Sequence, residues 1–140
     1  MRPTIEVEDT CIANPFAYSS EPVQRFDIIV FQGPEEVKKR HNVSGELRLL
    51  KRVIGLPNEK LEIKDNKIYI NDTLLEEPFE KIVDEKDQKR NLSAIIIPNN
   101  EYFVLGDNRP NSEDSRWWTK PTISKVDILG KIVQIIHKNE

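Results

Sequence analysis

The sequence predicts a mostly β domain of the all-β class, and three observations support that prediction. Apolar residues recur mainly with a period of two, β-branched residues cluster in short runs, and polar turn-forming segments separate those runs. A period of two places successive side chains on opposite faces, as a half-buried strand requires. The predicted strands lie within residues 26–31, 46–56, 60–71, 92–98, 101–107 and 128–136.

Turn-forming residues divide these strands. Asp65 and Asn66 tolerate a left-handed backbone and predict a hairpin turn at 64–67. Further turns are expected at 71–73 and 98–101, and a helical turn capped by Thr122 or Ser124 is expected before the last strand. Two polar segments, 34–46 and 76–91, are predicted to be surface excursions, the first a solvated loop and the second with one short helix.

Composition narrows the possible functions. A chain of 140 residues and 16.3 kDa is one domain, residues 1–140, with a single core. The net charge is −3, from 21 basic and 24 acidic residues without a basic stripe, which disfavours a nucleic-acid partner. The single Cys11 cannot form an internal disulfide and is expected to be a small buried apolar residue, while two histidines without a cysteine cluster do not make a zinc site. No metal and no cofactor is expected.

The chain itself is expected to be soluble. No stretch approaches the ~20 apolar residues that a membrane-spanning helix needs, and the longest aliphatic run, 94–97, is strand-like. No cleavable targeting signal is present either.

One lysine stands in an otherwise apolar strand. If 46–56 is a strand, Lys51 shares its face with Leu47, Leu49 and Val53, so its ammonium group loses most of its water. Burial among aliphatic side chains lowers the pKa of a lysine and makes the neutral amine available as a base. The alternation therefore marks Lys51 as a candidate for a desolvated amine with a lowered pKa; the alternative is a lysine that reaches solvent from a strand end.

A polar loop, 106–118, follows the apolar strand 101–105. A rigid turn accounts for its Asp, Asn and Pro residues. The loop carries more hydrogen-bonding side chains than one turn needs, so a functional role and a purely structural one are equally favoured. A calcium loop is disfavoured because the spacing is not that of an EF-hand and Arg109 and Arg116 intrude.

These stretches together resemble a known family. "KRVIGLPNE" (51–59), "GDNRPNSEDSRWW" (106–118), "MRPTI" (1–5) and "RFDIIVFQGP" (25–34) are similar to four signature segments of the type I signal peptidases, in the family's order. The self-cleaving SOS-type repressors share the Ser/Lys dyad but lack the 106–118 loop. The sequence departs from the family at four places: Phe26 replaces a glycine, Asn58 with Glu59 and the segment 7–9 stand in place of Gly-Asp, and Trp118 with Thr119 stands in place of Trp-Gly.

The resemblance implies a fold and a set of roles. It implies a coiled antiparallel β-sheet architecture without a large inserted second domain. Lys51 would be the general base of a Ser/Lys serine protease and Ser112 would orient it. Asp114 and Arg116 would form an ion pair that steadies the loop, and Asp107 and Arg109 would support the site structurally.

The resemblance also implies a substrate and a location. Signal peptides of exported proteins would bind in shallow pockets that accept small residues at the first and third positions before the cut. The residues expected to line these pockets are Met1, Ile5, Val30, Leu49 and Leu50. In the full-length protein a membrane anchor would hold the catalytic domain against the membrane surface on the extracytoplasmic side.

The nucleophile is the largest departure. In the family a serine directly precedes the residue that matches Met1, and this chain starts at Met1, so the 140-residue chain is expected to be inactive. Ser112 is a poor replacement, since it would attack from the orienting side of the amine. Two hypotheses remain: part of a catalytic signal peptidase, or a non-catalytic relative that binds extended peptides of exported proteins by strand addition.

Overall fold

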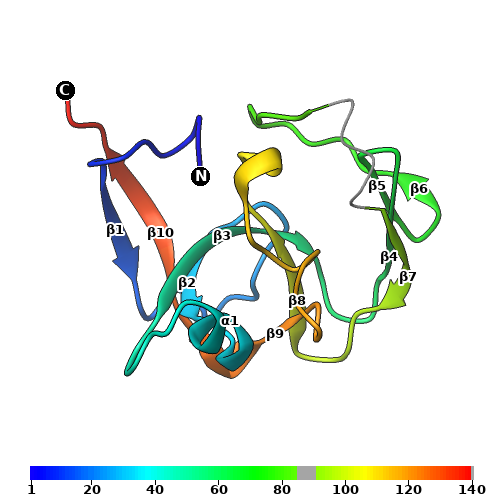
Figure 1. Ribbon diagram of the computed structural model, residues 1–140, viewed down its shortest axis with the longest axis horizontal. Helices are drawn as coiled ribbons and strands as arrows, with labels where there is room; N and C mark the ends of the chain where they lie inside the picture. Colours follow the sequence, from blue (N-terminus) through cyan, green and yellow to red (C-terminus); the bar gives the residue numbers. More distant parts are fainter. Residues whose placement is uncertain (85–90, 140) are drawn as a thin grey trace.

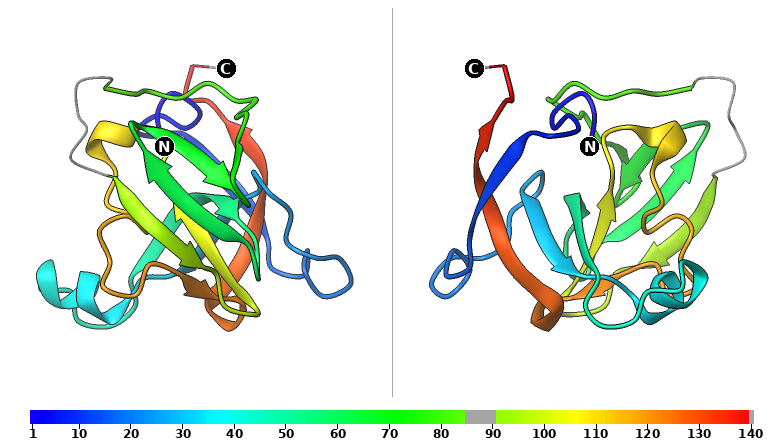
Figure 2. Two further views of the ribbon diagram at one scale, coloured as in Figure 1. Left: turned by 90° about the vertical axis from the view of Figure 1, so that its right-hand side faces the viewer. Right: turned by 60° about the vertical axis from the view of Figure 1, so that its left-hand side comes forward.

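Two antiparallel β-sheets form the molecule, whose computed structural model describes residues 1–84 and 91–139. The six-stranded sheet has the order β1-β10-β2-β3-β8-β9 and the four-stranded sheet the order β6-β5-β4-β7 (Figure 1). The strands are β1 (Thr10–Asn14), β2 (Ile28–Gln32), β3 (Arg48–Gly55), β4 (Lys60–Lys64), β5 (Lys67–Ile70), β6 (Thr73–Leu74), β7 (Leu92–Ile96), β8 (Glu101–Leu105), β9 (Ile123–Ser124) and β10 (Ile128–Ile136). The larger sheet curves strongly, and the smaller one lies at the opposite side of the molecule from the β1–β10 pair (Figures 1 and 2). The predicted all-β class and coiled antiparallel architecture are confirmed.

The predicted turns adopt the left-handed backbone that their residues favour. Asp65 and Asn66 have φ values of 52° and 62° between β4 and β5, and Asn100 has a φ of 58° before β8. The 3₁₀ turn η2 (Lys125–Asp127) begins at Ser124, whose hydroxyl accepts a hydrogen bond from Val126 N. Of the two caps considered, Ser124 is the one observed.

Left-handed backbone also occurs at three of the four places that depart from the family's glycine-containing pattern. Glu8, Phe26 and Asn58 have φ values of 75°, 74° and 68°. Only glycine adopts this region without a steric cost, which is roughly 1–2 kcal/mol for other residues and least for Asn. Tertiary contacts hold Phe26, since its ring packs edge-on against Phe79 with centroids 5.4 Å apart and its carbonyl accepts from Arg52.

The helical content differs from the expectation. The short helix α1 (Glu35–Arg40) lies in the 34–46 excursion, which was expected to be a solvated loop. The described part of the other excursion, residues 76–84, contains no helix and instead pairs Ile82 with Asn108 in a parallel bridge; the remainder, 85–90, lies outside the described residues. No helix in the part of the chain that the structure describes combines the length and apolar character needed to cross a bilayer.

Three short or exposed strands were not predicted. β6 and β9 contain two residues each, and β1 is exposed along four of its five positions, so none carries a clear alternating apolar signal. Cys11 lies in β1 and is partly exposed rather than buried, because β1 is an edge strand that pairs with β10 alone. The expectation of a buried Cys11 was therefore wrong.

Strand β3 lies between two hydrophobic cores. Val53 belongs to the first core, with Ile29, Phe31, Val104 and Trp118, whereas the next residue, Ile54, belongs to the second core, with residues of β4 and β5. Both side chains are fully buried, and each such burial contributes about 1.5–3 kcal/mol. Because both faces of β3 are covered around Val53 and Ile54, a basic residue in this half of the strand, such as Arg52, loses most of its water on folding.

Candidate active site

Lys51 and Ser112 meet although 61 positions separate them in the sequence. Lys51 lies on β3 opposite Ile29 of β2, and Ser112 lies in the loop that follows β8. The Lys51 Nζ donates a hydrogen bond to Ser112 Oγ over 3.0 Å. The antiparallel pairing of β3 with β8 places the loop beside Lys51, so the sheet register produces this contact.

Burial controls the charge state of Lys51. Desolvation is the largest effect and lowers its pKa; the nearby Asp114 and Glu113 raise the pKa and Arg116 lowers it. Within residues 1–84 and 91–139, no carboxylate forms an ion pair with Lys51. The amine therefore has a hydroxyl as its close partner, and this partner does not require a positive charge.

Gly106 permits the contact between the lysine and the serine. A Cβ atom at this position would lie 2.2 Å from Ser112 Oγ and 3.5 Å from Lys51 Nζ. The serine hydroxyl thus occupies the space that a side chain at position 106 would fill. Glycine is needed here for a close approach, because every larger residue would displace the hydroxyl.

An ion pair between Asp114 and Arg116 stabilises the loop from within. Arg116 donates to both carboxylate oxygens of Asp114, over 2.8 and 2.9 Å, and Asp114 is fully buried. Asp114 also accepts a hydrogen bond from Gly106 N over 3.1 Å, so the ion pair ties the two ends of the loop together. Ser115, also fully buried, accepts from Val104 N over 2.9 Å and fixes the loop to β8.

Asp107 pairs with Arg52, the residue next to Lys51 in the sequence. Arg52 donates from Nε to Asp107 Oδ1 over 3.0 Å and from Nη2 to Oδ2 over 2.7 Å. Thr4 donates to the same carboxylate over 2.5 Å, which attaches the N-terminal turn to the loop. Sequence reasoning missed Arg52 and Thr4; the signal was present, because an arginine on a strand with two buried faces needs an acidic partner.

Residues 76–84 pack against the same loop. Arg109 forms an ion pair with Glu77 and donates to Gly106 O over 2.9 Å. Ile82 exchanges backbone hydrogen bonds of 2.9 Å with the loop at Asp107 O and Arg109 N. Phe79 places its ring 4.0 Å from the Arg52 guanidinium carbon, so this segment covers the Arg52–Asp107 pair.

The N-terminal turn begins near Lys51. The pKa of the Met1 amino group is lowered, first by burial and then by the positive charge of Lys51. The Met1 nitrogen therefore lies within electrostatic reach of the Lys51 amine. A residue joined to Met1 would be attached at this nitrogen.

The expected substrate-lining residues fall on both faces of β3. Val30 and Leu50 are cross-strand partners on the face opposite Lys51, whereas Leu49 lies on the Lys51 face. Met1 and Ile5 belong to the N-terminal turn, in which Ile5 N donates to Met1 O over 3.1 Å. All five are partly exposed, as residues that meet a ligand must be.

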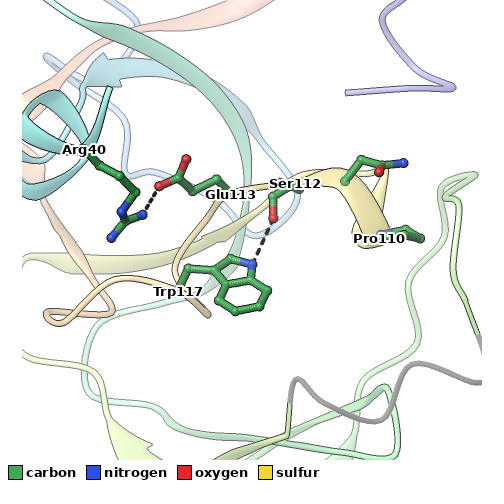
Figure 3. Close-up of a pocket in the computed structure, with 6 residues that line it drawn as sticks. Arg40, Pro110, Ser112, Glu113 and Trp117 are labelled. Atoms are coloured by element: carbon green, nitrogen blue, oxygen red, sulfur yellow. Dashed lines mark hydrogen bonds and ion pairs between the residues drawn. The ribbon is translucent and has the colours of Figure 1, made fainter. Parts of the chain in front are cut away.

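A hollow of about 350 Å³ adjoins the loop on the side of Ser112 (Figure 3). Its lining residues are Arg40, Pro110, Asn111, Ser112, Glu113 and Trp117. Trp117 donates from Nε1 to Ser112 O over 3.2 Å, and Arg40 approaches from helix α1 to pair with Glu113 (Figure 3). The backbone of Ser112 is thus held by Trp117 while its side chain faces Lys51.

This arrangement can remove a proton from a nucleophile. A buried amine with a lowered pKa supplies the lone pair, and a fixed hydroxyl orients it. The surrounding ion pairs immobilise the loop without contributing a carboxylate to the amine.

Comparison with known proteins agrees with the geometry. A family model described as "Signal peptidase, peptidase S26" matches residues 1–137. A signal peptidase I from Leptolyngbya laminosa is 38% identical over 133 residues, covering 95% of this chain and 62% of that protein. Signal peptidase I V of Bacillus subtilis (strain 168) is 35% identical over 142 residues, covering 94% of this chain and 77% of that protein.

A solved structure matches as well. The crystal structure of a signal peptidase I from Enterococcus faecalis V583 superposes with a TM-score of 0.63 at 31% sequence identity, covering 81% of this chain and 98% of that one. The curated relatives are longer than this chain, which spans 62% of the Leptolyngbya laminosa protein and 56% of a signal peptidase I from Pseudomonas aeruginosa.

Proposed function

Because the chain belongs to the signal peptidase family, peptidase S26, we propose that it is the catalytic part of a serine endopeptidase that removes signal peptides from exported proteins. The observation that carries this proposal is the 3.0 Å contact between the partly buried Lys51 amine and Ser112. A relative that only binds peptides has no need of a desolvated lysine, whose burial costs free energy.

In this proposal the nucleophile is a serine joined to Met1, and Lys51 is the general base. The neutral amine donates one N–H to Ser112 Oγ, which directs its lone pair toward the serine hydroxyl. The lone pair takes the hydroxyl proton as the serine oxygen bonds to the scissile carbonyl carbon. The position of the Met1 nitrogen near Lys51 supports this assignment.

The same amine then returns the proton. The tetrahedral adduct collapses when the C–N bond breaks and the leaving nitrogen accepts the proton from Lys51, which leaves the signal peptide as an acyl ester on the serine. A water molecule gives a proton to Lys51 and attacks the ester carbon; the ester bond breaks and the serine regains its proton. Every proton passes through one nitrogen, so the mechanism requires a lysine that is neutral at working pH.

Substrate selection is assigned to the residues at the two sides of β3. Met1 would meet the residue before the cut, and Ile5, Val30, Leu49 and Leu50 are the further candidates for the pockets of the first and third residues before it. Partial burial of all five supports shallow pockets, in which only small side chains fit. Signal-peptide-bearing chains of exported proteins are the proposed partners.

The proposed setting is a membrane surface. Signal peptidases of this family are membrane-associated. In the full-length protein an anchor would hold this domain on the extracytoplasmic side, where exported chains emerge.

The test adds the proposed nucleophile to the chain. The chain is prepared with a serine directly before Met1 and a short upstream segment, and cleavage of a peptide that carries Ala-x-Ala is measured. A matched protein carries Lys51→Met, which keeps the bulk of the side chain and removes the amine. A general base contributes about 10²–10⁴-fold, so cleavage should fall by at least that factor.

Two outcomes would contradict the proposal. Equal cleavage by both proteins would show that Lys51 is not the base. A folded protein that binds the peptide and cleaves it in neither form would instead establish a peptide-binding relative.

A further inference from the structure

Helix α1 is fastened to the catalytic loop at both of its ends. At its start, Glu36 accepts hydrogen bonds from Thr119 N over 2.7 Å and from Thr119 Oγ1 over 3.1 Å. At its end, Arg40 forms an ion pair with Glu113, and His41 Nε2 lies 2.7 Å from the second oxygen of the same carboxylate. These contacts bridge more than 70 positions of sequence, and the loop between them, 113–119, contains the Asp114–Arg116 pair.

Glu113 is the point at which this helix approaches the reacting groups. It directly follows Ser112, whose hydroxyl contacts Lys51 Nζ over 3.0 Å. An uncompensated carboxylate here would favour the protonated amine, and the negative charge of Glu113 does raise the pKa of Lys51. One oxygen of Glu113 faces Arg40 of α1, and the other faces His41, directly after the helix (Figure 3 shows the Arg40 contact).

We propose that Arg40 is a positioning residue of the active site, which neutralises Glu113 and so keeps the neighbouring Lys51 amine in its neutral, proton-accepting form. Arg40 touches no reacting atom in this proposal; it acts through Glu113. Helix α1 supplies the geometry, since its own Glu36 lies 3.5 Å from Arg40 and orients the guanidinium toward the loop. The proposal rests on the proposed function only in that Lys51 is the base.

The other charges around Lys51 come from two directions. Asp114 and Arg116 belong to the loop and neutralise each other in a buried ion pair. The Met1 amino group lies on the side of the N-terminal turn. Among the described residues, Asp114 and Glu113 are the acidic groups that act on Lys51. Asp114 is paired within the loop, whereas Glu113 is paired with Arg40 of helix α1.

The test measures the amine itself in the 140-residue chain, without any cleavage. Lysines are trace-labelled with acetic anhydride over a series of pH values, and the labelling of the Lys51 peptide is followed by mass spectrometry. Arg40→Gln should lower the labelling rate of Lys51 about twofold at pH values below its midpoint, and Glu113→Gln should raise it about twofold, the size expected of a partly exposed, screened charge pair.

The opposite signs separate this role from a structural one. If both variants shift the labelling in the same direction, the contacts between α1 and the loop act by holding the loop in place rather than by charge, and the proposal is overturned. In the double variant both charges are gone, so their opposite effects should cancel and the labelling of Lys51 should return to about that of the unmodified chain; labelling that stays as in either single variant would also overturn the proposal.

A control lies on the same helix. Lys38→Gln removes a positive charge from α1 that pairs with Glu35 rather than with the loop. It should leave Lys51 labelling as in the unmodified chain, and a decrease equal to that of Arg40→Gln would contradict the assignment to the Arg40–Glu113 pair. Failure of the peptide-cleavage assay would leave all of these labelling results intact, so the two proposals fail separately.

Discussion

Lys51 and Arg52 are consecutive basic residues on opposite faces of β3, and the protein treats them in opposite ways. Arg52 is 8% exposed and forms a bidentate ion pair with the fully buried Asp107. Lys51 is also largely buried, but its close partner is the hydroxyl of Ser112. The buried arginine is thus fully compensated, and the partly buried lysine is left with a neutral partner.

The difference separates a structural charge from a chemical one. A guanidinium does not deprotonate in proteins, so Arg52 must have a carboxylate when it is buried. An amine can lose its proton instead, and burial lowers the pKa of Lys51. The Arg52 face thereby supplies rigidity, and the Lys51 face supplies a base.

Breaking the compensated side should have the largest effect on stability. Arg52→Met leaves Asp107 buried without its cation, and we expect the free energy of unfolding to fall by about 3–5 kcal/mol in urea denaturation. The control Arg48→Met, on the same strand, removes an exposed pair with Glu46 and should cost less than about 1 kcal/mol. Similar losses in the two variants would contradict the importance of the buried pair.

Crowding the uncompensated side should have an intermediate effect. Gly106→Ala places a Cβ where the Ser112 hydroxyl lies, and we expect a loss of about 1–3 kcal/mol in thermal unfolding as the loop shifts. Lys51 then loses its partner, so cleavage by the serine-extended protein should fall as well. Gly130→Ala is the matched control, since the nearest atom there is 3.0 Å from the new Cβ; an equal loss would show that the effect is not specific to the site.

Removing the uncompensated charge should stabilise the fold modestly. The pKa of Lys51 is lower in the folded chain than in the unfolded one, so the unfolded state binds the proton first as pH falls. Stability therefore decreases from pH ~10.4, the ordinary lysine value, down to the folded pKa. Lys51→Met avoids this loss and should be about 1 kcal/mol more stable at pH 7.

The pH dependence distinguishes this effect from better packing. The advantage of Lys51→Met over the unmodified chain should shrink as pH rises toward ~10.4, where the unfolded lysine also loses its charge. The exposed Lys64→Met should show no such trend. An advantage of Lys51→Met that stays constant from pH 7 to pH 10 would contradict a desolvated charge at Lys51.

Much of the fold follows from local pattern. Period-two alternation predicts the strands that carry buried residues, such as β3 and β8, and Asp65 with Asn66 predicts its hairpin because these residues tolerate the left-handed backbone. The same pattern missed β1, whose apolar Ile12 is exposed and whose place is set by pairing with β10. Helix α1 was missed because six residues give too little periodic signal to separate a helix from a polar loop.

The sequence by itself determined which residues lose water: alternation places Lys51 among aliphatic side chains, and that placement alone identifies an amine with a lowered pKa. Only the tertiary structure decided what each buried group meets. The pairings of Lys51 with Ser112, of Arg52 with Asp107 and of Arg40 with Glu113 join positions 55 to 73 residues apart. The physical reason is that burial of a strand face follows from its own side-chain period, whereas a partner across a loop depends on sheet register and on the packing of helix α1, which no local pattern encodes.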